Sequence, residues 1–97
     1  MSSPLTIDSL LADAVACHRA GRAAAAAAGY AAVLARDPGH GDALHLSGVV
    51  LAQRGRFAEA VTTMAQAAAL HPAAVSYRAN LARSEEHTSE LQSPYVI

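Results

Sequence analysis

The sequence predicts an all-α protein made of antiparallel helix-turn-helix units that repeat along the chain. The first observation is an internal period: shifting the sequence by 34 residues aligns Gly21 with Gly55 and Pro38 with Pro72. The second is that apolar residues recur at helical spacing on either side of each glycine. The third is that each unit closes on a proline, which cannot continue a helix. These observations together predict a short stack of helical hairpins.

Length and composition limit what such a stack can do. With 97 residues the chain is at most one small domain, and its formal net charge of -1 gives no reason to expect a nucleic acid or an anionic membrane as partner. A single cysteine, Cys17, excludes an internal disulfide framework and fits a reducing compartment. No stretch approaches the ~20 apolar residues of a membrane span. We therefore expect a cytoplasmic protein.

The first repeat is expected at residues 7–40, after a short lead at residues 1–6. Its first helix places Leu10, Ala14 and Cys17 at helical spacing and ends at Gly21, where a left-handed backbone costs least. Its second helix, over residues 22–36, contains six consecutive alanines, the residue with the highest helix propensity. The sequence Asp-Pro-Gly at residues 37–39 ends it.

The second repeat, residues 41–74, follows the same plan. We expect helices over residues 41–54 and 57–70, a turn at Gly55 and a break at Pro72. Residues 75–82, VSYRANLA, begin the first helix of a third unit that does not continue as a repeat. Because a single hairpin cannot bury its apolar face, each unit needs a neighbour.

The second repeat resembles a tetratricopeptide repeat. Residues 42–72, DALHLSGVVLAQRGRFAEAVTTMAQAAALHP, carry the family's small residues, turn glycine, aromatic residue and closing proline, and the first repeat matches more loosely. The resemblance covers residues 7–82 and implies a short right-handed solenoid of about 2.3 repeats. It assigns structural roles to Gly21, Ala26, Pro38, Gly48, Gly55, Phe57, Ala60, Ala67 and Pro72.

The packing inside the second hairpin can also be predicted. Gly48 and Ala60 are expected where its two helices cross, because small side chains let backbones approach closely. The apolar filling is expected from Leu44, Leu51, Phe57, Val61, Met64 and Leu70. Since the third repeat is incomplete, we expect the apolar face of the helix over residues 57–70 to be poorly covered and to favour self-association.

Residues 83–93, RSEEHTSELQS, differ in composition from everything before them. They correspond to one reading frame of a widely used short-read sequencing adapter, so we interpret residues 83–97 as an artefact tail and expect it to be irregular or disordered. The gene would then be interrupted within its third repeat. The alternative is a genuine polar C-terminal segment, which this composition also allows.

The sequence offers little chemistry. His18, His40, His45 and His71 are the candidate ligands or bases, but no cysteine or paired carboxylate completes a metal set. Cys17 has no neighbour in the sequence that would activate it as a nucleophile. We therefore predict no catalytic residue, no cofactor and no metal in this chain.

Binding is the predicted function. The resemblance implies a concave wall, lined by the first helix of each repeat, that holds an extended peptide of an unidentified partner protein. Its groove positions correspond to Asp8, Leu11, Val15, His18, Arg19, Asp42, His45, Val49, Gln53 and Asn80, with Ser76 and Ala79 beside the last. The alternative is that the repeats form the front of a bacterial-type glycosyltransferase or sulfotransferase whose catalytic domain is missing from this chain.

Overall fold

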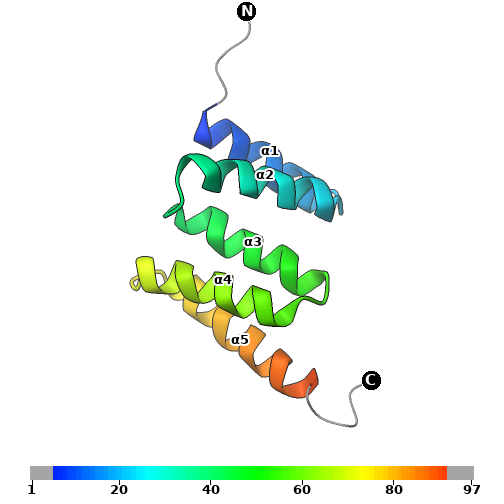
Figure 1. The fold of residues 1–97 in the computed structure, drawn as a ribbon, viewed down its shortest axis with the longest axis vertical. Helices are drawn as coiled ribbons and strands as arrows, with labels where there is room; N and C mark the ends of the chain where they lie inside the picture. Colours follow the sequence, from blue (N-terminus) through cyan, green and yellow to red (C-terminus); the bar gives the residue numbers. More distant parts are fainter. Residues whose placement is uncertain (1–5, 92–97) are drawn as a thin grey trace, which may run out of the picture.

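The structure is a computed structural model that describes residues 6–91, and this part of the chain consists of five helices joined by short turns. They are α1 (Ile7–Arg19), α2 (Ala23–Arg36), α3 (Gly41–Gln53), α4 (Phe57–Leu70) and α5 (Val75–Leu91). Successive helices run in opposite directions and stack in chain order along the longest axis (Figure 1). The residues described contain no strand, so the predicted all-α class is confirmed.

The helix ends lie close to the predicted positions. Gly21 and Gly55 both adopt a φ of 80°, the left-handed conformation that favours glycine at a helix C-terminus. At the start of α1, the Thr6 hydroxyl accepts from the Ser9 amide and the Ser9 hydroxyl accepts from the Thr6 amide. His40 caps α3, because its Nδ1 accepts from the Ala43 amide at 3.2 Å. Each hairpin therefore has defined ends.

Close contact between paired helices depends on small residues, as predicted for the second hairpin. A Cβ atom added to Gly48 would lie 2.5 Å from Cγ of Met64 and 3.2 Å from the Ala60 carbonyl oxygen. In the first hairpin the glycine is on the second helix instead, and a Cβ on Gly29 would lie 2.6 Å from Cβ of Ala14. Both hairpins use one glycine to bring the helices together.

Within the described part of the chain, the core contains two clusters of buried residues, one between α1, α2 and α3 and the other between α3, α4 and α5. Its buried apolar residues are Ala14, Ala26, Tyr30, Val33, Ala43, Leu44, Val50, Ala60, Met64, Ala67 and Tyr77. Of the expected filling residues, Leu44 and Met64 are buried, and Leu51, Phe57 and Val61 are half-buried. The expectation for Leu70 is wrong, since its side chain is 55% exposed. It is the last residue of α4, where the chain leaves the packed part of the hairpin.

The expectation of an irregular tail from residue 83 is also wrong for residues 83–91, because α5 continues to Leu91. Residues 75–91 contain neither glycine nor proline, so nothing in the local sequence ends the helix. Ser84 is 7% exposed and donates its hydroxyl to Sδ of Met64 at 3.2 Å, which fixes this part of α5 on α4. The coding origin of residues 83–93 stays a prediction, and residues 92–97 lie outside those described.

Candidate functional site

Three hydrogen-bonded pairs connect the first helices of neighbouring repeats. His18 on α1 pairs with Gln53 on α3, and Asp42 and His45 on α3 pair with Tyr77 and Asn80 on α5. In every pair the two residues are 35 positions apart, one more than the repeat length. We call these three pairs the inter-repeat ladder; they fix the side chains that line one wall of the molecule.

The first contact region of the ladder, between α1 and α3, is centred on His18. Its Nε2 lies 2.8 Å from Oε1 of Gln53, and its Nδ1 lies 2.9 Å from the Tyr30 hydroxyl. The Oε1 atom of Gln53 can only accept, so Nε2 of His18 donates to it, and in that tautomer Nδ1 accepts from the Tyr30 hydroxyl. Burial, with a smaller contribution from Cys17, raises the pKa of Tyr30 above its usual value. The tyrosine therefore stays protonated and remains a donor to His18.

The second contact region holds α5 on α3. The rings of His45 and Tyr77 stack, with centroids 4.7 Å apart and an angle of 24° between planes. Tyr77 donates its hydroxyl to Asp42, and its other neighbour is His71, whose ring meets it edge-on at 6.1 Å. Burial and the bond to Asp42 raise the pKa of Tyr77 to about 12. Tyr77 therefore remains protonated and donates its hydroxyl hydrogen to Asp42.

His45 is the most unusual side chain of this wall. It is 8% exposed, its Nε2 lies 3.0 Å from Nδ2 of Asn80, and its Nδ1 is buried without a hydrogen-bond partner. Burial lowers the pKa of His45 below its usual value, and the carboxylate of Asp42 only partly opposes this effect. The imidazole is therefore held in its neutral form, with one ring nitrogen unsatisfied.

A groove of about 480 Å³ lies along this wall between the first helices. It combines apolar side chains with a cation, a carboxylate and hydroxyl groups, so it can contact both polar and apolar parts of a ligand. Its lining residues are Val15, His18, Arg19, Tyr30, Asp42, His45, Leu46, Ser76 and Tyr77.

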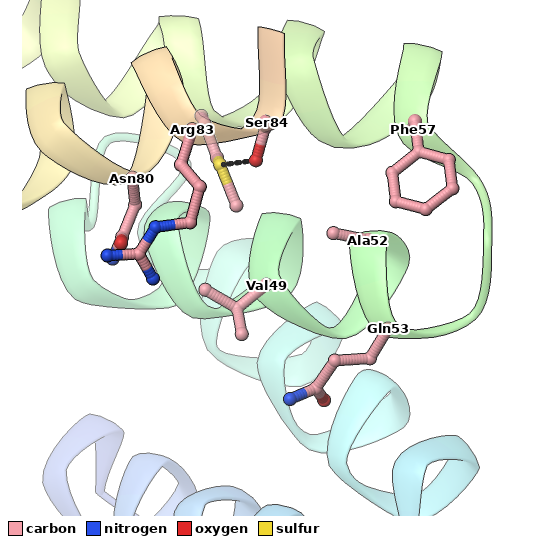
Figure 2. Close-up of a pocket in the computed structure, with 8 residues that line it drawn as sticks. Val49, Ala52, Gln53, Phe57, Asn80, Arg83 and Ser84 are labelled. Carbon is pink, nitrogen blue, oxygen red and sulfur yellow. Dashed lines mark hydrogen bonds between the residues drawn. The ribbon is translucent and has the colours of Figure 1, made fainter. Parts of the chain in front are cut away.

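A smaller pocket of about 300 Å³ lies between α3, α4 and α5 (Figure 2). Its interior is apolar, with Met64 and Phe57 as its larger members, while Asn80 and Arg83 supply amide and guanidinium groups on α5. The full lining is Val49, Ala52, Gln53, Phe57, Met64, Asn80, Arg83 and Ser84. This pocket suits an apolar side chain next to a polar or negative group.

The structure brings together most of the predicted groove residues but divides them between the two cavities. The groove contains Val15, His18, Arg19, Asp42 and His45, and the smaller pocket contains Val49, Gln53 and Asn80.

Two predicted residues lie in neither cavity: Leu11 packs against the core, and the exposed Asp8 is in the first turn of α1. Tyr30, Tyr77 and Arg83 were not predicted. Aligning the sequence with itself at an offset of 35 residues instead of 34 would have paired Asp42 with Tyr77. No offset related to the repeat would have identified Tyr30.

The described residues show no arrangement typical of a metal or redox site. Among the side chains that the structure describes, those of residues 6–85, no three His, Cys, Asp or Glu residues gather as metal ligands would. Cys17 is a half-buried free thiol. None of the helices in this part of the chain has the length and apolar character needed to cross a membrane.

These features define the class of protein: an array of helical hairpins whose first helices form a ligand-sized groove. The comparison with protein families agrees, because the tetratricopeptide repeat model matches residues 18–83. The chain belongs to the tetratricopeptide repeat family. The matched residues include both turn glycines, Gly21 and Gly55.

Among solved structures, the chain is similar to a mutant O-GlcNAc transferase of Thermobaculum terrenum. The TM-score is 0.80 and the sequence identity 32% over 87% of this chain. The match covers only 16% of the transferase chain. The comparison with curated proteins gives no match.

Proposed function

We propose that this chain is a non-catalytic scaffold that binds an extended peptide segment of a partner protein along its first helices. The observation that carries the proposal is that two hydrogen-bonded pairs, His18 with Gln53 and His45 with Asn80, each join a residue of the groove to a residue of the smaller pocket. His18, Gln53, His45 and Asn80 are held by each other, so the surface between the cavities is preorganised. Preorganisation reduces the entropic cost of binding.

The chemistry of the two cavities favours a peptide over a small rigid ligand. An extended peptide presents side chains and backbone amides in alternation, and the groove offers Arg19, Ser76 and Asp42 for polar contacts. The smaller pocket offers an apolar space bounded by Met64 and Val49. A peptide that crosses α3 would place polar groups in the groove and one apolar side chain in the pocket. We infer that the scaffold works in the cytoplasm.

Selection of binders from a random peptide library, followed by titration calorimetry, tests the proposal. Val49→Glu places a longer, charged side chain in the apolar interior of the smaller pocket, which Arg83 also lines, and should weaken the selected peptides by at least about tenfold, because it occupies the space proposed for an apolar side chain of the peptide. Thr62→Glu introduces the same charge at an exposed site of α4 outside both cavities and should leave affinity unchanged. The proposal fails if no sequence family is selected, or if both variants lose affinity equally.

A second candidate function is favoured by the structural match. We propose, as the alternative, that these repeats belong to the N-terminal region of a glycosyltransferase or sulfotransferase. The 32% identity to part of an O-GlcNAc transferase supports this alternative. Sequencing the source gene across codon 82 tests it: a downstream domain with a nucleotide-binding α/β fold would support it, and a gene that contains only helical repeats would refute it.

A further inference from the structure

The turns within the two hairpins lie side by side on one edge of the molecule. The turn between α1 and α2 and the turn between α3 and α4 are on the same side of the stack (Figure 1). The hydrogen bond between His18 and Gln53, at 2.8 Å, joins the two chain segments directly before these turns. Groups on the two turns can therefore contact one ligand together.

Positive charge is concentrated on this edge, although the formal net charge of the chain is negative. Its four arginines are all exposed: Arg19, Arg22, Arg54 and Arg56. We call this set the arginine edge. Across residues 18–23 and 53–59 the only acidic residue is Glu59.

The opposite edge is more acidic. Asp8, Asp37 and Asp42 lie at the start of α1 and around the turn between α2 and α3, against Arg36 at the end of α2 and Arg78 near the start of α5. The formal net charge of -1 is thus the sum of a positive edge and a negative remainder. Charge of one sign gathered on one edge attracts a partner of the opposite sign.

Arginine at two of these positions is unfavourable for the fold itself. Arg22 and Arg56 are the N-cap residues of α2 and α4, and neither helix has a side-chain cap. A Ser, Thr, Asp or Asn would cap these helices, and a positive charge opposes the positive end of the helix dipole. Among the side chains that the structure describes, those of residues 6–85, none forms an ion pair with these four guanidinium groups. The same local cost is repeated in both hairpins, which indicates a role other than stability.

We propose that the arginine edge binds an acidic segment of a partner protein, with Asp or Glu carboxylates on the guanidinium groups. Arginine pairs with carboxylates through two parallel hydrogen bonds, and one such pair at each turn fits a peptide that crosses both. A nucleic acid fits less well, because four cations on a narrow edge of a net negative chain do not make the broad basic surface that it requires. Arg22, Arg54 and Arg56 lie outside the groove lining, so the arginine edge shares only Arg19 with the proposed groove.

Fluorescence anisotropy with the intact chain tests the proposal. The probes are a labelled Glu-rich peptide, the same peptide with Gln in place of Glu, and a single-stranded oligonucleotide of equal length. The double variant Arg22→Gln/Arg56→Gln should weaken the Glu-rich peptide about fivefold to tenfold, as expected for the loss of two exposed ion pairs. Arg78→Gln, an exposed arginine of α5 outside the edge, should change affinity less than about twofold.

The outcomes separate this proposal from the groove. Preference for the Glu-rich over the Gln peptide, weakening with added salt, and loss in the double variant alone support the arginine edge. Equal binding of both peptides, equal losses in the double variant and Arg78→Gln, or tighter binding of the oligonucleotide would overturn it. Peptides selected for the groove should bind the double variant normally. Circular dichroism should show the double variant at least as stable as the wild type, because an unfavourable charge is removed from two helix N-termini.

Discussion

Replacing Gly29 by alanine should destabilise the protein, although alanine is normally the better helix residue. The substitution gains about 1 kcal/mol in helix propensity. The added Cβ, however, would lie 2.6 Å from Cβ and 3.1 Å from Cα of Ala14, and neither atom can rotate away. Overpacking a core costs up to about 3 kcal/mol, so the expected net loss is about 2 kcal/mol. In a chain of this size that loss lowers Tm by roughly 8–16 °C.

Thermal and urea unfolding followed by circular dichroism measure this effect, and Gly48→Ala supplies an internal comparison. Its Cβ would lie 2.5 Å from Cγ of Met64, which a rotamer change can move, and 3.2 Å from the Ala60 carbonyl oxygen, which needs only a small shift, so the net loss should be smaller, about 1 kcal/mol. Ala65→Gly, at an exposed position of α4, calibrates the propensity term. The reasoning is refuted if Gly29→Ala is as stable as the wild type, or if Gly48→Ala is the more damaging change.

Three further predictions concern α5 and its contacts. Because the pKa of His45 is lowered on folding, its contribution to stability is complete above the unfolded value of 6.5 and is lost as the pH falls below it. Melts from about pH 8 to pH 5 should show this loss, and His45→Gln should remove part of the slope. Ser84→Val should raise stability by roughly 0.5–1 kcal/mol in urea unfolding, because Ser84 occupies in α5 the core position of Val50 in α3; a loss of stability would count against that equivalence. Leu70→Gln should reduce any self-association seen by sedimentation, since Leu70 and Val75 are the exposed large apolar residues in the described part of the chain; unchanged association would place the contact elsewhere.

The fold was largely predictable because its determinants are local and repeated. Turn glycines, closing prolines and small crossing residues each have a direct physical role, and their recurrence at 34 residues identifies the hairpins without any long-range information. The end of α5 was not predictable in the same way. The change of composition after residue 82 indicated a change of origin, but helix propensity and the burial of Ser84 depend on the residues themselves and not on their origin.

The sequence predicted which helices would carry the candidate site, but not how its residues pair. Equivalent repeat positions lie on equivalent helices, and five of the predicted residues line one groove; their role in binding stays a prediction. The contacts, however, join residues 35 apart, which corresponds to a shift of one residue, or about 1.5 Å, between neighbouring first helices. That stagger depends on how the hairpins pack, and so does the insertion of Tyr30 from a second helix into the wall. Neither the stagger between the helices nor the position of Tyr30 can be predicted from the repeat period alone.

The pairing also changes which residues can determine specificity. A side chain that already holds a neighbouring helix must give up that bond before it can bind a ligand, and the loss offsets much of what the ligand would gain. His18, Gln53, His45 and Asn80 are committed in this way. Arg19 is not, and it lies both on the groove and on the arginine edge. A partner whose peptide follows the groove and continues into an acidic segment would therefore meet Arg19 at the junction, and Arg19→Gln should weaken binding at both surfaces while Arg54→Gln affects only the edge.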